Sequence, residues 1–227
     1  NAYGKGRSFL FCLRCLFRRN NNGEIVDVNR MREKIVVESD DPDVQAEAQR
    51  VKNGEKNGRN IAIEVVGLVK TFHGGDLRAV DGISYGIDDN SLFVLLGHNG
   101  AGKTTTINCL TGLYNPTFGE AFVFGHSIKD EITQVQKLMG VCPQHDVLFN
   151  ELTAGEHLQF WARFKGIARK ELNEHVEQTL KDISLEGKGG NLASTFSGGM
   201  KRRLSVGMSA MGNPKVIFLD EPTTGLD

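Results

Sequence analysis

The sequence has few of the features that mark secreted, membrane-spanning or nucleic-acid-binding chains. Its 227 residues hold only four cysteines and no Asn-x-Ser/Thr sequon, which argues against a disulfide-stapled secreted protein. No uncharged apolar run reaches the roughly 18 residues that a transmembrane helix needs, so no segment is expected to span a bilayer. The formal net charge of −1 supplies no field that would attract nucleic acid.

The chain also lacks an initiator methionine and a signal-peptide pattern. We therefore expect that Asn1 is not a natural start and that the chain is a piece of a longer protein. Glycine, in contrast, is abundant, with 27 residues. Because glycine admits positive φ angles and close backbone approach, this excess indicates tight or ligand-binding loops in the folded part.

The first 59 residues have the composition of a linker. Five basic residues and no acid lie within residues 1–20, and the polar stretch 20–60 holds a predicted short helix at 44–51. In segment 8–19, phenylalanines and leucines alternate with arginines. Two interpretations stay open: contact with the cytoplasmic membrane surface, or a strand or helix docked on another part of the protein. Cys12 and Cys15 form a lone CxxC, which is too few ligands for a zinc site and fits thiols near a membrane better.

From residue 61 onward, strand patterns alternate with helix patterns. Val, Ile and Leu runs predict strands at 61–66, 79–87, 92–96, 121–124 and 216–219. Helices are predicted at 104–113, 131–138 and 170–183, after Ser197, and after a capping box formed by Thr153 and Glu156. This alternation is typical of an α/β fold with a parallel sheet.

A glycine-rich segment fits the phosphate-loop pattern GxxxxGK[ST]. It lies between the predicted strand 92–96 and the predicted helix 104–113, which is the context that the pattern requires. Glycines let backbone N–H groups surround phosphate oxygens, and the helix N-terminus adds the positive end of its dipole. We therefore expect Lys103 to reach the β- and γ-phosphates of ATP and Thr104 to bind Mg²⁺. The predicted binding loop consists of Gly97, His98, Asn99, Gly100, Ala101, Gly102, Lys103, Thr104 and Thr105.

A second motif is an apolar strand that ends in two carboxylates, Asp220 and Glu221. Such a strand is typical of a buried parallel sheet, and ligands bind at the carboxyl ends of parallel strands. We expect Asp220 to hold Mg²⁺ through water and Glu221 to polarise the attacking water as a general base. Many strands end in an acid, so this motif gains its weight from the phosphate loop that precedes it.

The third element is the segment 196–200, in which Ser197, Gly198 and Gly199 open a predicted helix and form a second anion-binding end. Here the sequence resembles the ATP-binding-cassette (ABC) ATPases, whose signature is LSGGQ. Phe196 stands where the family usually has leucine, and Met200 where it usually has glutamine. The resemblance implies that the Ser-Gly-Gly segment contacts ATP held by the opposite subunit.

Further landmarks of the family follow in order. Gln144 matches a glutamine that the resemblance implies senses Mg²⁺, takes part in catalysis and couples to the membrane domain. Phe72 matches an aromatic residue that stacks on adenine, although a core phenylalanine is the competing interpretation. Residues 224–227 match the start of the D-loop, and residues 151–211 match the helical subdomain.

Four segments of the sequence are similar to the A subfamily of ABC transporters, the lipid exporters. These segments are GHNGAGKTTT, VCPQHDVLF, SGGMKRRLSVGM and EPTTGLD. The resemblance covers residues 60–227, and residues 1–59 look like the cytoplasmic linker after a transmembrane domain. It implies an α/β fold with a P-loop NTPase (RecA-like) core, an antiparallel β subdomain and an α-helical subdomain. Because the family places a switch histidine beyond residue 227, we expect the C-terminal part to be missing and the isolated piece to be poorly active.

The resemblance implies that the domain binds and hydrolyses ATP with Mg²⁺ and thereby powers transport by a membrane protein. It also implies that the domain lies on the cytoplasmic face of the membrane. The implied partners are the transmembrane domains of the same transporter and a second nucleotide-binding domain, with no nucleic acid. Two alternatives stay open: a soluble ABC ATPase of the translation or repair type, and a nucleotide-binding module without turnover.

Two further groups are expected to have structural roles. The run Lys201, Arg202 and Arg203 is interpreted as a solvated helix face rather than a nucleic-acid contact. Cys109 and Cys142 are expected to be buried as small hydrophobic residues.

Overall fold

The computed structural model describes the backbone of residues 18–19 and 25–26, and residues 41–54, 58, 60–72 and 77–222 in full. The expectations for Cys12, Cys15 and the D-loop residues 224–227 lie outside the described residues, as does most of segment 8–19. The chain divides into two compact units, residues 1–135 and 136–227. Near the N-terminus, β1 (Arg18–Arg19) pairs antiparallel with β2 (Ile25–Val26).

The first unit is built on a four-stranded antiparallel sheet with the order β4-β3-β5-β6. Its strands are β3 (Ile61–Phe72), β4 (Leu77–Asp88), β5 (Phe118–Val123) and β6 (His126–Ser127). Most apolar residues of β3 and β5 are buried, among them Val65, Val66 and Val123. The strands predicted at 61–66, 79–87 and 121–124 are therefore confirmed.

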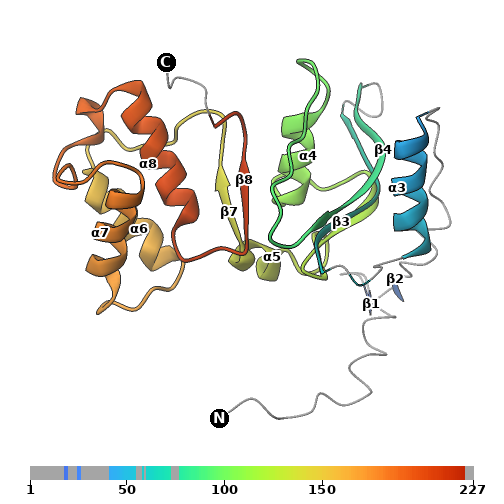
Figure 1. Ribbon diagram of the computed structural model, residues 1–227, viewed down its shortest axis with the longest axis horizontal. Helices are drawn as coiled ribbons and strands as arrows, with labels where there is room; N and C mark the ends of the chain where they lie inside the picture. Colours follow the sequence, from blue (N-terminus) through green and yellow to red (C-terminus); the bar gives the residue numbers. More distant parts are fainter. Residues whose placement is uncertain are drawn as a thin grey trace, which may run out of the picture. The chain divides into compact units, whose positions relative to one another are not determined.

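A helix from the linker-like region packs on this sheet. Helix α3 (Pro42–Asn53) begins at Asp41, whose carboxylate accepts the N–H of Asp43, and ends at Gly54 in the left-handed conformation. Its Ala48 and Val51 form an apolar cluster with Val66 and Phe122 of the sheet (Figure 1). The predicted helix at 44–51 is thus confirmed and is longer than expected.

The predicted strand at 92–96 is wrong, because residues 91–98 form neither helix nor strand. Leu92 and Leu96 are 93% and 84% exposed. A parallel strand exists only when a neighbouring backbone takes up its N–H and C=O groups, and no strand in the described part of the chain pairs with this run. Phe93 alone finds an aromatic partner, since its ring stacks on Tyr85 at 5.4 Å between centroids. Helix α4 (Lys103–Leu110) follows.

The second unit contains a parallel pair of strands and a cluster of helices. Strands β7 (Met139–Cys142) and β8 (Val216–Leu219) pair in parallel without a register shift. Helices α6 (Ala154–Phe164), α7 (Leu172–Asp182) and α8 (Gly198–Ala210) enclose one apolar core. The short 3-10 helix η2 (Ala193–Thr195) precedes α8. Helix α5 (Ile132–Leu138) contains the boundary between the two units. Among the described residues, no helix has the length and hydropathy that crossing a membrane requires.

The start of α6 is fixed by local chemistry. The Thr153 hydroxyl accepts the N–H of Glu156, and the Glu156 carboxylate accepts the N–H of Thr153 at 2.7 Å. These two bonds satisfy N–H groups that a helix N-terminus leaves without partners, so the predicted capping box is confirmed.

Candidate nucleotide-binding site

The predicted phosphate loop packs tightly against β4. Gly102 precedes α4 with φ 85°, and a Cβ atom at this position would lie 2.2 Å from the carbonyl oxygen of Ala79. Gly100 also has a left-handed φ of 84°. Both positions therefore require glycine for conformation, and position 102 also requires it for space. These two positions explain part of the glycine excess.

Lys103 and the loop backbone form a cradle that suits phosphate. The Lys103 ammonium donates to the carbonyl oxygens of Gly97 at 2.7 Å and His98 at 3.0 Å, which places its charge at the loop. Beside the loop lies a hollow of about 360 Å³, a volume suited to a small molecule. Its lining includes Gly100, Ala101, Lys103 and Thr106. The positive helix end and the lysine charge fit an anionic ligand here.

The remaining loop residues face the ligand side or solvent. Asn99 and Thr104 are exposed, and Thr105 is half-buried in the first turn of α4. The His98 ring bonds to the carbonyl oxygen of Asn99 at 2.8 Å. Because Thr104 leaves its hydroxyl accessible, it is free to serve as an oxygen ligand for Mg²⁺.

Phe72 ends β3 in an aromatic pair with Tyr114. Their rings meet edge to face with centroids 5.4 Å apart, and the Lys70 ammonium lies 5.0 Å from the Phe72 centroid. The half-buried Phe72 ring thus belongs to a small aromatic surface rather than to the sheet core. Stacking of adenine on Phe72 stays a prediction.

The second unit brings two predicted residues together at the ends of adjacent strands. The side-chain amide of Gln144 donates to the Glu221 carboxylate at 2.8 Å. The pairing of Cys142 with Leu219 explains this contact, since each catalytic candidate follows two residues after those partners. Glu221 has a left-handed φ of 46°, an unusual conformation for a residue with a side chain.

Asp220 is buried at the end of β8, and its binding of Mg²⁺ stays a prediction. Asp220 is 7% exposed, and its backbone N–H donates to the carbonyl oxygen of Cys142 at 3.0 Å. Among the described residues, no group of three or more His, Cys, Asp or Glu could hold a metal ion alone. Mg²⁺ in nucleotide sites needs no such group, because it keeps several waters and phosphate oxygens as ligands.

The segment around Ser197 caps α8 as predicted. The Ser197 hydroxyl accepts the N–H of Met200 at 3.3 Å, while Ser197 and Gly198 remain exposed and Gly199 is half-buried. Phe196 is buried in the apolar core of the helical cluster, so its ring occupies a packing position that leucine could also fill. The phenylalanine at position 196, where the ABC family usually has leucine, thus leaves the exposed Ser-Gly-Gly segment unchanged.

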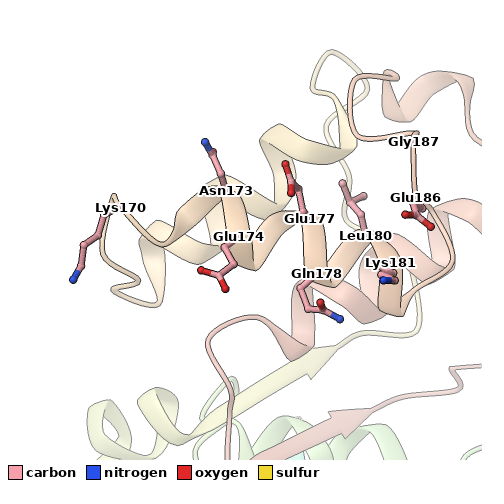
Figure 2. Close-up of a pocket in the computed structure, with 9 residues that line it drawn as sticks. All are labelled: Lys170, Asn173, Glu174, Glu177, Gln178, Leu180, Lys181, Glu186 and Gly187. Carbon is pink, nitrogen blue, oxygen red and sulfur yellow. The ribbon is translucent and has the colours of Figure 1, made fainter.

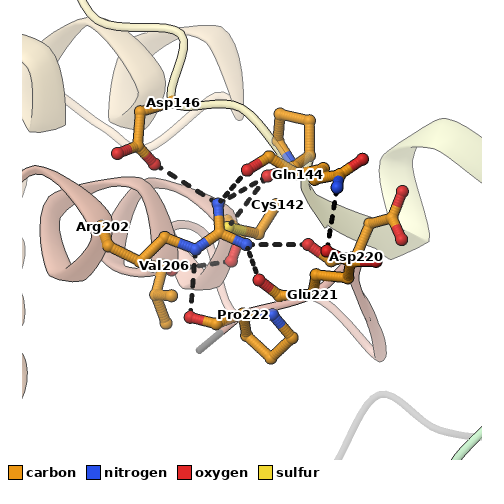
Figure 3. A network of polar contacts seen from close by, with 10 residues as sticks. Cys142, Gln144, Asp146, Arg202, Val206, Asp220, Glu221 and Pro222 are labelled. Atoms are coloured by element: carbon orange, nitrogen blue, oxygen red, sulfur yellow. Dashed lines mark hydrogen bonds and ion pairs between the residues drawn. The ribbon is translucent and has the colours of Figure 1, made fainter. Parts of the chain in front are cut away.

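The interpretation of the basic run after this segment is wrong for Arg202. Its side chain is buried, at 1% exposure, and its guanidinium lies in a polar network between the segments that follow β7 and β8 (Figure 3). The helical spacing of the sequence could have indicated this burial, because Arg202 shares a helix face with Ser205 and Ser209, which are also buried. The expectation for Cys109 and Cys142 is confirmed, since both are fully buried and burial raises the pKa of both thiols.

A larger hollow of about 660 Å³ lies along α7 (Figure 2). Polar side chains on successive turns of that helix, such as Glu174, Glu177 and Lys181, line it instead of the predicted site residues. The predicted site residues therefore lie in two separate places, the phosphate loop in the first unit and the ends of β7 and β8 in the second.

A family model described as ABC transporter matches residues 80–224. The chain is 43% identical over 205 residues to ABC transporter A family member 2 of Arabidopsis thaliana, covering 83% of this chain and 21% of that protein. It is 46% identical over 167 residues to the human phospholipid-transporting ATPase ABCA3, covering 73% of this chain and 10% of that protein. The chain thus spans about a fifth or less of the length of these curated relatives.

Solved structures show the same relationship. One is the dimeric structure of a post-hydrolysis state of the ATP-binding cassette MJ0796 bound to ADP and Pi, with TM-score 0.67 and 26% identity. The match covers 73% of this chain and 76% of that one. Another is the ATP binding subunit of an ABC transporter, with TM-score 0.66 and 28% identity.

Proposed function

The chain belongs to the ABC transporter family, and on that premise we propose that it binds and hydrolyses ATP to power lipid transport by an A-subfamily transporter. The hydrogen bond between Gln144 and Glu221 carries this proposal, because it joins two predicted catalytic residues from segments far apart in sequence. The lipid substrate is supported by the relative named as a phospholipid-transporting ATPase.

In the proposed mechanism, the phosphate loop holds ATP. Backbone N–H groups of residues 97–105 and the Lys103 ammonium bind the phosphates, and Phe72 stacks on adenine. Thr104, Asp220 and Gln144 would hold Mg²⁺, which would supply positive charge for the phosphate oxygens. Glu221 accepts a proton from the attacking water as general base.

The proposed partners follow from the subfamily. Ser197, Gly198 and Gly199 contact ATP held by a second nucleotide-binding domain, and the exposed N-terminus of α8 supports that role. The dimeric state of the ATP-binding cassette MJ0796 supports the same arrangement. Transmembrane domains of the same transporter are the other partner, and the domain lies on the cytoplasmic face of a membrane.

We also propose how the chain is divided. Residues 60–227 form the nucleotide-binding domain, with the helical subdomain at about 151–211. Residues 1–59 form the linker to the membrane, in which α3 packs on the sheet and segment 8–19 contacts the membrane surface.

Two variants of the complete protein test the chemistry. Lys103→Ala removes a charge-assisted contact to phosphate of about 1.5–3 kcal/mol, so ATP affinity should fall about 10- to 100-fold. Glu221→Gln should bind ATP and fail to turn it over, which filter binding and phosphate release measure separately. Lys181→Ala and Glu177→Gln, both exposed on α7, are matched controls that should retain activity.

Unchanged ATPase activity in Glu221→Gln would contradict the assignment of the base. Nucleotide binding without any hydrolysis in the unaltered complete protein would instead identify a module without turnover.

A further inference from the structure

We propose that Arg202 is a positioning residue that holds Gln144 and Glu221 in their catalytic arrangement. The inference rests on the proposed function, since it concerns the water-activating carboxylate of that site. Arg202 lies on α8, just after the Ser-Gly-Gly segment, and its guanidinium reaches the ends of both parallel strands (Figure 3).

The contacts of Arg202 fall into two groups. Nη1 donates to the segment after β7, and Nη2 and Nε donate to the segment after β8. The acceptors are the carbonyl oxygens of Pro143 at 2.6 Å, Gln144 at 3.3 Å, Asp220 at 2.8 Å, Glu221 at 2.8 Å and Pro222 at 3.0 Å, and Oδ1 of Asp146 at 3.3 Å. One side chain therefore ties the backbone beneath Gln144 to the backbone beneath Glu221.

Burial of the Arg202 guanidinium costs free energy that its hydrogen bonds must offset. A guanidinium removed from water must recover its lost hydration through hydrogen bonds, and Arg202 is almost fully buried. Asp146 supplies its one ion pair among the described residues; the other acceptors are neutral carbonyls. The planar fork of arginine matches such a spread of acceptors, whereas lysine presents its donors from a single point.

The backbone that Arg202 holds is strained. Glu221 has φ 46°, where the Cβ atom crowds the backbone, and such a conformation persists only when its surroundings enforce it. Nη2 donates to the carbonyl oxygens of Asp220 and Glu221, which belong to the two peptides on either side of the Glu221 Cα atom. When these bonds are lost, we expect the backbone at Glu221 to relax and to move the Glu221 carboxylate away from Gln144.

Relaxation at this position should affect turnover and spare substrate binding. The phosphate loop belongs to the other unit, whereas the hydrogen-bond acceptors of Arg202 given above all lie in the unit of Arg202 itself. A misplaced general base lowers kcat, and a small displacement can cost about 100-fold in rate. KM for ATP should therefore change little while kcat falls.

The test is steady-state ATPase kinetics of the complete protein carrying Arg202→Gln, with Glu221→Gln as the benchmark. The fall in kcat from the unaltered protein to Glu221→Gln measures how much of the turnover depends on the Glu221 carboxylate. We expect the fall in kcat of Arg202→Gln to be most of this amount, while its KM for ATP stays within about twofold of the unaltered protein. Arg203→Gln is the matched control, because the described acceptors of Arg203 are the carbonyls of Gly199, Ile183 and Ser184, which lie at neither strand end.

Two further variants keep the test decisive if Arg202→Gln does not fold. Arg202→Lys retains the charge and should restore only part of kcat, because it cannot reach both strand ends. Asp146→Asn removes the charge partner at a half-exposed position and should lower kcat modestly in the same direction. Unchanged kcat in these variants, or a parallel loss in Arg203→Gln, would overturn the proposal. Absence of ATPase activity in the unaltered protein would instead overturn the proposed function.

Discussion

The closest contact in the phosphate loop yields a quantitative prediction. Replacing Gly102 by alanine forces a residue with a Cβ atom into a left-handed conformation, which costs about 1–2 kcal/mol. The new Cβ would also lie 2.2 Å from the carbonyl oxygen of Ala79, more than 1 Å short of ordinary contact at 3.4–4 Å. Overpacking of this kind adds about 1–3 kcal/mol, so Gly102→Ala should destabilise the unit by about 2–5 kcal/mol.

Gly100 provides the matched control for this prediction. Its φ of 84° is almost the same as that of Gly102, yet a Cβ atom there meets no described atom within 4 Å. Gly100→Ala should therefore cost only the conformational part, about 1–2 kcal/mol. Urea unfolding followed by far-ultraviolet circular dichroism measures both, provided that the slope with urea stays unchanged. Equal destabilisation by the two variants would refute the reasoning from the Ala79 contact.

Two further predictions concern the fold around the site. Burial raises the pKa of Glu120 to about 7 from its ordinary 4.5, so the folded state retains a proton that the unfolded state has lost. The contribution of Glu120 to the free energy of unfolding should therefore be greatest below about pH 4.5 and fall as the pH rises to about 7. Glu120→Gln should remove this pH dependence, which urea unfolding at pH 5 and pH 8 would show. Thr153→Ala removes the N-cap of α6 and should cost about 1 kcal/mol, and an unchanged unfolding midpoint would contradict the role of the capping box.

Local signals in the sequence predicted most of the elements well. Ser197 and Thr153 both begin helices at the predicted positions, because a side-chain oxygen that accepts a backbone N–H acts over only three residues. The run Val216–Leu219 is a strand with the predicted bounds. The side chains at Gln144 and Glu221 meet because parallel strands end at the same edge, which follows from topology.

The failures concern features that depend on distant partners. The run 92–96 has the residues of a buried strand, but strand formation depends on a neighbouring backbone that its own residues cannot indicate. Arg202 has the same local character as Arg203, and only the carbonyls supplied by residues far away in the sequence make its burial tolerable. Composition describes a residue's preference for water, whereas burial depends on what the whole fold provides.

The unshifted register of β7 and β8 limits which length changes this domain can accept. Asp220 is buried and Glu221 is exposed, and both follow directly after β8. Deletion of one residue from β8 would shift its pairing with β7 by one position and carry Asp220 and Glu221 out of these two environments. Insertions and deletions should therefore be tolerated in the surface turns between the helices, while the four paired positions of each strand must keep their length.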